Sequence, residues 1–142
     1  REDTKTFEWI LGFHDFQQMF DKLTMGRFGS RILNLGCGNS AMTEHMYDHG
    51  YHSIVNVDNS SVVIEQMLQK NAGRSQMRWT VGDCTNLSFE NESFDVVIEK
   101  SLLDTLVCGS NAPQVVSAYL AEVWRGLRRT GIFLCISFGT PD

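Results

Sequence analysis

The segment from Ile32 to Ser40, which reads Ile-Leu-Asn-Leu-Gly-Cys-Gly-Asn-Ser, constrains the fold of this chain more than any other. A short apolar run enters a turn that has glycine at positions 36 and 38, and a stretch of helical character follows. Glycine lets a backbone turn tightly and approach a ligand closely, and the amides that open the next helix face the same gap. This pattern predicts a nucleotide-type cofactor site at the tip of the first strand of an α/β sheet.

Strands and helices are expected to alternate along the whole chain. Apolar runs predict strands over residues 32–35, 53–57, 77–81, 94–98 and 132–137. Helical spacing predicts helices over about 13–26, 40–49, 61–70 and 113–131, the last with an inward stripe of Val116, Leu120, Val123 and Leu127. This alternation indicates a Rossmann-like, doubly wound parallel sheet with right-handed crossovers.

Composition narrows the classes of protein that are possible. The 142 residues suit one domain over 1–142, in which residues 1–30 form a helical segment that packs on the sheet. A net charge of −5 and the lack of a basic stripe argue against nucleic-acid binding, and no apolar run is long enough to span a membrane. The four cysteines form no C-x-x-C pair, which favours free thiols and a cytoplasmic location.

Histidines at positions 45 and 49 have the spacing of metal ligands on a helix. No acid or cysteine completes a ligand set beside them, so we expect solvated side chains here and no metal site.

Acidic side chains follow the predicted strands at the edge where a ligand would bind. Asp58 comes twenty residues after Gly38, where an acid can accept both ribose hydroxyls. Asp83 follows the third strand and could accept an exocyclic amine, although capping its own turn is the plainer interpretation. Glu99 and Lys100 end the fourth strand beside the same cleft.

The glycines alone leave the cofactor open. Gly36-x-Gly38-x-x-Ala41 with Asp58 also fits a dinucleotide site, so an NAD-dependent oxidoreductase stays an alternative. The acid at Asp83 favours a single adenosine, which needs recognition of its ribose from one strand end and of its adenine from the next.

Three segments, Leu35–Ser40, Ile54–Met67 and Phe94–Asp104, resemble the class I S-adenosylmethionine-dependent methyltransferases. The similarity spans roughly residues 8–137 and is greatest to the branch that modifies lysines of translation elongation factor 1-alpha. The resemblance implies S-adenosyl-L-methionine as cofactor, S-adenosyl-L-homocysteine as product, and a lysine of a protein such as elongation factor 1-alpha as acceptor.

The same resemblance assigns cofactor contacts by position. Gly36 would contact the methionine part within a turn that includes Cys37 and Gly38, and Asp58 with Asn59 would hold the ribose. The further implied contacts are Asp83 and Cys84 beside the adenine, and Lys100 and Trp9 lining the pocket. Asn34 departs from the wider class, in which this position is often acidic and binds the methionine amine.

The chemistry that this family performs sets what the enzyme must supply. A sulfonium already activates the methyl group, so no nucleophile of the enzyme is needed and Cys37 is interpreted as a turn residue. Glu99 and Asp104 are the candidates for orienting a lysine ammonium, and a structural alternative for Glu99 is capping of the following loop. An Asn/Asp-Pro-Pro-aromatic signature is missing from the sequence, which argues modestly against acceptors with planar nitrogens.

The family fold has seven strands and five are visible in this sequence, so we expect a core truncated after the fifth strand. That strand would then be an open edge able to pair with another molecule. Two further alternatives stay open: a small-molecule methyltransferase, and an inactive cofactor-binding subunit that supports a partner.

Overall fold

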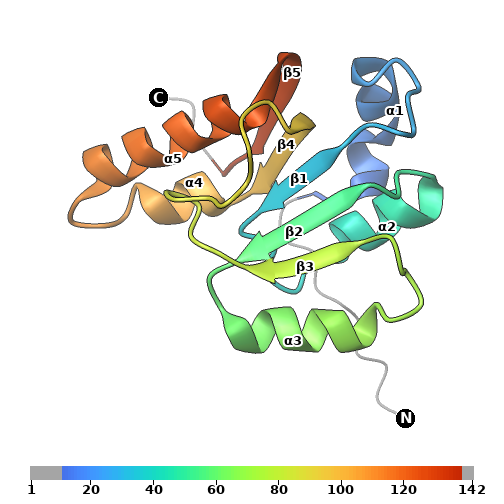
Figure 1. Ribbon diagram of the computed structural model, residues 1–142, viewed down its shortest axis with the longest axis horizontal. Helices are drawn as coiled ribbons and strands as arrows, with labels where there is room; N and C mark the ends of the chain where they lie inside the picture. The colour runs from blue at the N-terminus through green and yellow to red at the C-terminus, as the bar shows by residue number, and fades with distance from the viewer. Residues whose placement is uncertain (1–10, 139–142) are drawn as a thin grey trace.

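A five-stranded parallel sheet with helices on both faces forms the centre of the molecule (Figure 1). The computed structural model describes residues 11–138. The strands lie in the order β3-β2-β1-β4-β5. Their bounds are β1 Ile32–Leu35, β2 Ile54–Asp58, β3 Arg78–Val81, β4 Phe94–Lys100 and β5 Leu127–Ile136.

The strand order places a topological switch at β1. The chain runs outward from β1 through β2 to β3 and then returns to the other side of β1 as β4 and β5. Ile32 of β1 pairs with Ile54 on one side and with Val96 on the other, in parallel register. In sheets of this kind the crevice that binds ligands lies outside the carboxyl ends of the strands, where the order reverses.

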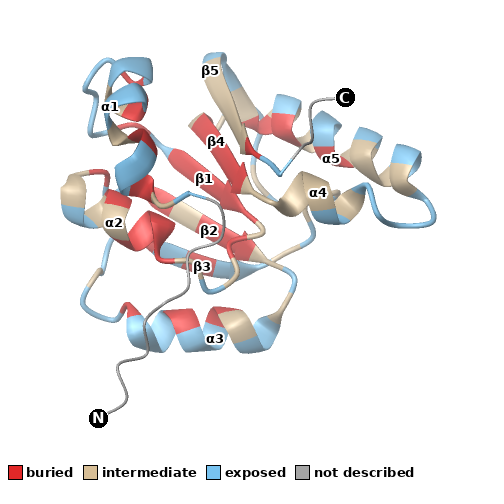
Figure 2. Ribbon diagram, turned by 180° about the vertical axis from the view of Figure 1, so that it is seen from behind, coloured by how far each residue is buried: buried red, intermediate tan, exposed pale blue. Residues whose placement is uncertain are grey.

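Helices cover the two faces of the sheet unequally. Their bounds are α1 Phe13–Leu23, α2 Met42–His49, α3 Ser61–Lys70, α4 Leu102–Leu106 and α5 Ala112–Gly126. The first three pack with one face through a core that includes Phe13, Met46 and Ile64, whereas α4 and α5 cover the other face around Tyr119 (Figure 2). Successive residues of a strand point to opposite faces, so every residue of β1 is buried between these layers.

The observed architecture confirms the predicted Rossmann-like fold and most of its elements. The helix over 61–70 begins and ends as predicted, and Ser60 caps it by accepting a hydrogen bond from the Val63 amide. Gly50 ends α2 with a φ of 134°, a conformation open to glycine. Pro113 lies in the first turn of α5, where its missing N–H costs nothing.

The C-terminal part of the prediction is corrected in two places. The helix α5 ends at Gly126 instead of 131, because Leu127 is already extended and pairs with Phe94 across a bulge. Val123 of the predicted stripe is buried together with Tyr119, whereas Leu120 is 41% exposed. The short helix α4 had no counterpart in the prediction, since five residues are too few to show helical periodicity.

Two strands form the edges of the sheet within residues 11–138, namely β3 and β5. Ile132, Phe133 and Leu134 of β5 are only half-buried, so this edge is less covered than the continuous apolar run suggested. Pairing of this edge with another molecule stays a prediction.

Two classes of feature are missing from the part of the chain that the structure describes. None of its helices combines the length and the apolar character needed to cross a bilayer. No three side chains of His, Cys, Asp or Glu gather there closely enough to hold a metal ion.

Candidate active site

The glycine turn after β1 is formed by backbone conformations that side chains disfavour. Gly36 and Gly38 have φ values of 63° and 51°. A Cβ built on Gly36 would lie 3.1 Å from the side chain of Leu102, so space as well as conformation requires glycine there. The Cys37 amide donates to the Val57 carbonyl at 3.0 Å and closes the turn against β2.

The thiol of Cys37 is suited to packing and not to nucleophilic chemistry. Cys37 is 5% exposed, and burial together with the charge of Asp58 raises its pKa to about 12. All four cysteines are free, as the sequence predicted.

Asp58 at the end of β2 holds the glycine turn and the next helix together. Its Oδ2 accepts a hydrogen bond from the Gly38 amide at 2.9 Å, and its Oδ1 accepts one from the Ser60 amide at 2.9 Å. Each carboxylate oxygen has two lone pairs, so both keep an acceptor site for a ligand hydroxyl. The carboxylate is therefore preorganised beside the turn.

A cleft of about 620 Å³ lies at the carboxyl ends of the strands and brings together groups from several of them. It is lined by Gly36, Val57, Asp58, Asn59, Gly82, Asp83, Cys84, Thr85, Lys100, Ser101, Leu102, Thr105, Leu106 and Val115. This volume is within the range of small-molecule and cofactor sites. Asp58 and Asp83 thus lie in the wall of one hollow, 25 positions apart in the sequence.

A smaller hollow of about 240 Å³, which we call the annex, adjoins the cleft. It is lined by Gly36, Cys37, Gly38, Asn39, Ser40, Lys100, Ser101 and Phe138. Three residues, Gly36, Lys100 and Ser101, belong to both hollows and mark their junction.

Asp83 is exposed, and its own turn uses only one of its oxygens. Oδ1 accepts hydrogen bonds from the amide and the hydroxyl of Thr85, at 2.8 and 2.6 Å, and these bonds lower the pKa of the carboxyl. The turn-capping interpretation is thus correct for Oδ1, while the residue still lines the cleft. Burial and the charge of Asp83 raise the pKa of the neighbouring Cys84 thiol.

Lys100 links the cleft to the start of the described chain. Its Nζ donates to the Leu11 carbonyl at 3.1 Å, just before α1. Trp9, the other residue expected to line this side of the pocket, lies outside the described residues.

Glu99 lies behind the wall of the cleft and not in it. Its side chain is completely buried, and Oε2 accepts from the Leu102 amide at 2.7 Å. Oε1 accepts from the Cys135 thiol at 2.6 Å, and burial followed by this bond raises the pKa of Cys135 to about 12. Of the two expectations for Glu99, the structure therefore favours capping of α4 over contact with an acceptor.

Asp104 fastens α4 to the end of β5. Its two oxygens accept from the Ser137 hydroxyl and, at 2.9 Å, from the Phe138 amide, and both bonds lower its pKa. The carboxylate is consequently ionised and lies on the helix that supplies Leu102 and Thr105 to the cleft.

Several residues of the cleft wall were not predicted from the sequence. Ser101, Leu102, Thr105, Leu106 and Val115 line it, and the first four come from the turn into α4 and from α4 itself. The i, i+4 apolar pair of Leu102 and Leu106 was an available signal for a short helix. No sequence signal marks Ser101, whose importance depends on its backbone conformation.

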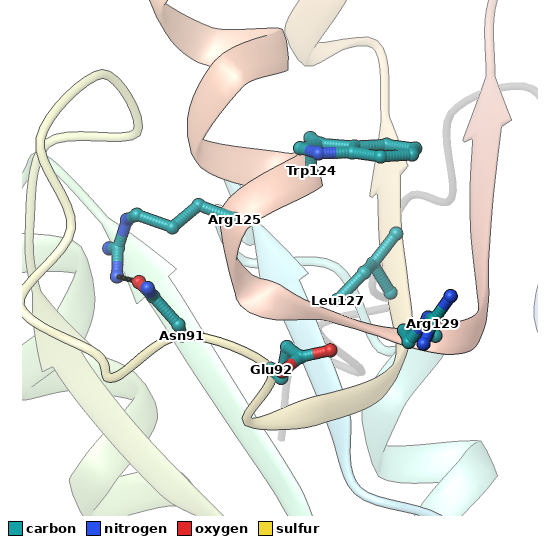
Figure 3. A pocket seen from close by; sticks show the side chains of 6 residues that line it. All are labelled: Asn91, Glu92, Trp124, Arg125, Leu127 and Arg129. Atoms are coloured by element: carbon teal, nitrogen blue, oxygen red, sulfur yellow. Dashed lines mark hydrogen bonds between the residues drawn. The ribbon is translucent and has the colours of Figure 1, made fainter.

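Another hollow, of about 330 Å³, lies at the opposite, amino ends of β4 and β5 (Figure 3). It is lined by Asn91, Glu92, Trp124, Arg125, Leu127 and Arg129. Figure 3 shows Arg125 turned away to bond Asn91, while Trp124 stands out from α5. This hollow has no glycine turn, so the carboxyl-end cleft is the better candidate for a cofactor site.

The cleft suits a nucleotide-type cofactor. Gly36 lets the turn pack directly against Leu102 in the cleft wall, and the Asp58 carboxylate is oriented by two backbone amides. The fold and this site define a Rossmann-like domain for a nucleotide-type cofactor.

Comparison with known proteins identifies the family. Residues 33–135 match the methyltransferase domain, and the chain belongs to this family. It is 40% identical over 136 residues to the human eEF1A lysine and N-terminal methyltransferase, covering 94% of this chain and 19% of that protein. It is 35% identical over 147 residues to the bovine EEF1A lysine methyltransferase 4, covering 98% of this chain and 57% of that one. The chain thus spans about a fifth of the first relative and just over half of the second.

Solved structures agree with the fold. The PH0226 protein of Pyrococcus horikoshii superposes with a TM-score of 0.70 at 26% identity, over 86% of this chain and 55% of that chain. The methyltransferase CalH in complex with S-adenosylhomocysteine superposes with a TM-score of 0.67 at 19% identity, over 82% and 34%. S-adenosyl-L-methionine is the cofactor of this methyltransferase domain.

Proposed function

We propose that this chain is the cofactor-binding core of an enzyme that methylates a lysine side chain of a protein, with elongation factor 1-alpha as the substrate. The observation that carries this proposal is the 40% identity, over 94% of the chain, to a protein named for that reaction. The free cysteines agree with a reducing, cytoplasmic setting, where this substrate would be met.

The residues of the cleft divide the work of holding the cofactor. The Asp58 carboxylate accepts hydrogen bonds from the ribose hydroxyls, and the Asn59 side chain donates to the ribose. Asp83 accepts a hydrogen bond from the adenine amine through its second oxygen, and Cys84 packs beside the base. At the junction, Gly36 and Lys100 lie along the methionine part, with Cys37 and Gly38 supplying turn amides and Trp9 closing the pocket. When bound, the cofactor supplies a methyl group from its sulfonium sulfur, and this sulfur becomes a neutral thioether once the methyl group has been transferred.

The acceptor imposes a further requirement, because a free lysine has a pKa near 10.4 and only about a thousandth of it is neutral at pH 7.4. The ammonium therefore gives a proton to water before the lone pair of the amine attacks the methyl group. We assign Asp104 to orient the ammonium, since its depressed pKa keeps it ionised on α4, the helix that supplies Leu102 and Thr105 to the cleft. Glu99 receives a positioning role, the alternative that stood beside substrate contact in the sequence analysis: it holds the amino end of α4, the helix that carries Asp104. Alignment of amine, methyl and sulfur can contribute on the order of 7 to 11 kcal/mol.

The test is methyl transfer by the full-length protein that contains this sequence. Purified elongation factor 1-alpha is incubated with radiolabelled S-adenosylmethionine, and labelled peptides are identified by mass spectrometry. We expect label on a lysine side chain, with Asp58→Ala as the inactive control. Label that appears only on small molecules would replace this proposal by the small-molecule alternative, and a complete lack of transfer into a cell lysate would favour the inactive subunit.

A second variant distinguishes a role in orienting the acceptor from a role in binding the cofactor. Asp104→Asn is expected to lower the rate of methyl transfer roughly tenfold or more while S-adenosylhomocysteine binds as in the wild type. An unchanged rate in Asp104→Asn would remove this residue from the acceptor site. Calorimetry with NAD in parallel checks the dinucleotide alternative, which requires binding of NAD and none of S-adenosylhomocysteine.

A further inference from the structure

Ser101 has a backbone conformation that its side chain disfavours. It joins β4 to α4 with φ 70° and ψ 3°, the left-handed region in which only two other described non-glycine residues, Met25 and Glu92, are found. Its surroundings enforce this conformation: the Ser101 amide donates to the Ile136 carbonyl at 2.8 Å, and Thr105 donates back to the Ser101 carbonyl. Strain of this kind is found at ligand sites, where the fold over-determines it.

The hydroxyl of Ser101 is also unsatisfied. Four buried side-chain polar atoms have no hydrogen-bond partner in the part of the chain that the structure describes: His45 Nδ1, Trp79 Nε1, Ser101 Oγ and Tyr119 OH. Ser101 is the one of these residues that lines the cleft and the annex. A buried hydroxyl without a partner is costly, so its retention at such a place points to a partner that binds from outside.

The position of Ser101 indicates which part of a ligand it meets. The carboxylates of Asp58 and Asp83 line the cleft, and the amides of the glycine turn border the annex. Ser101 belongs to both hollows. A ligand with a nucleoside at one end and an amino acid at the other, lying across both hollows, has its middle at this junction.

We propose that Ser101 is a cofactor-contacting residue whose hydroxyl turns, by rotation about χ1, to place its oxygen against the positively charged sulfonium methyl group. A serine side chain has three staggered χ1 positions, so this rotation needs no backbone movement. Oxygen lone pairs favour the polarised C–H groups of a sulfonium methyl over the neutral thioether of the product. This inference rests on S-adenosylmethionine as cofactor and is independent of the lysine acceptor.

The test compares affinities of the full-length protein for S-adenosylmethionine and S-adenosylhomocysteine by calorimetry. Ser101→Ala is expected to weaken S-adenosylmethionine binding roughly three- to tenfold and to change S-adenosylhomocysteine binding less. The thermal midpoint without ligand should not fall, because alanine has the same backbone strain and removes an unsatisfied hydroxyl. Ser101→Gly should show the same loss of affinity with a higher midpoint, since it also relieves the left-handed conformation.

The matched control is Tyr119→Phe, which removes another unpartnered buried hydroxyl, on α5. Both affinities should equal those of the wild type in this variant. The proposal would be overturned if the affinities of Ser101→Ala for S-adenosylmethionine and S-adenosylhomocysteine kept their wild-type ratio, whether both were unchanged or both fell by the same factor. If the protein binds S-adenosylmethionine but does not methylate lysine, the proposed acceptor is refuted. The Ser101 proposal is then still decided by the two affinities of Ser101→Ala.

Discussion

The two ends of the parallel sheet differ in how completely their polar groups are satisfied. At the amino end, the guanidinium of Arg125 donates to the carbonyls of Leu87 and Phe89 and to the side chains of Asn91 and Glu122. At the carboxyl end, the hydroxyl of Ser101 has no partner among residues 11–138. The guanidinium of Arg125 is thus used fully within the fold, whereas the wall of the carboxyl-end cleft keeps a hydroxyl whose hydrogen-bonding capacity is unused.

The largest effect is expected from Asp58→Ala at the carboxyl end. Loss of the carboxylate removes the proposed ribose acceptor and frees the Gly38 and Ser60 amides, so affinity for S-adenosylhomocysteine should fall by about 2 to 4 kcal/mol, or roughly 30- to 1,000-fold. Calorimetry measures this loss. Unchanged affinity would show that the ribose lies elsewhere.

Gly36→Ala should follow, with losses in both binding and stability. The new Cβ meets Leu102 at 3.1 Å in a left-handed conformation, which costs about 1 to 3 kcal/mol of unfolding free energy and narrows the junction. The matched control is Gly26→Ala, whose φ of 66° is similar but whose Cβ meets nothing within 4 Å. Chemical denaturation and calorimetry of both variants separate backbone strain from the loss of space. Equal cofactor affinity in both variants would contradict the close contact at Gly36.

Arg125→Ala sharpens the comparison from the amino end. Removing its bonds should cost roughly 1 to 3 kcal/mol of stability at pH 7 and leave cofactor affinity unchanged. Arg125 lowers the pKa of Glu122, so this carboxylate stabilises the fold above its unfolded pKa, about 4.3, and the contribution is lost as the pH falls through the lower folded value. The difference in unfolding free energy between wild type and variant should therefore shrink below about pH 4.3.

Arg128→Ala is the control for charge alone. Its ion pair with Asp95 is largely exposed, so a loss of at most about 1 kcal/mol is expected. A larger loss in Arg128→Ala than in Arg125→Ala would contradict the saturated network assigned to the amino end.

The smallest effect is expected from Trp124→Gln in the hollow of Figure 3. Trp124 is 84% exposed and Trp79 is 7% exposed. In a Trp9→Phe background, the substitution should change stability by less than about 0.5 kcal/mol and remove the fluorescence that iodide quenches. Stability measurements and quenching titrations check this, and a loss above about 1 kcal/mol would show that the protein buries this face.

The sequence predicted correctly those features that depend on a few consecutive residues. The apolar run at 32–35 with its glycines predicted β1 and the turn, and the spacing of Asp58 and Asp83 after their strands predicted that both would reach one edge of the sheet. These features are local, because apolar periodicity and left-handed turns are properties of a few consecutive residues. Asp58 and Asp83 accordingly line one cleft in the structure.

Tertiary contacts decided the rest. Leu127 belongs to β5 and not to α5 because Phe94 offers it a strand partner, which no helical pattern reveals. Glu99 is a buried cap because the Leu102 amide and the Cys135 thiol converge on its carboxylate from α4 and β5. Ser101 is left-handed because β5 and α4 hold its amide and carbonyl.

The sequence by itself thus determined the order of the elements, the glycine turn and the acids at the strand ends. Only the tertiary structure decided which acids face the cleft and which support its wall. The physical reason is that a carboxylate looks the same in the sequence whether it is buried behind the wall of the cleft, as in Glu99, or lines the cleft, as in Asp58. That distinction depends on which amides and thiols distant segments bring within hydrogen-bonding reach.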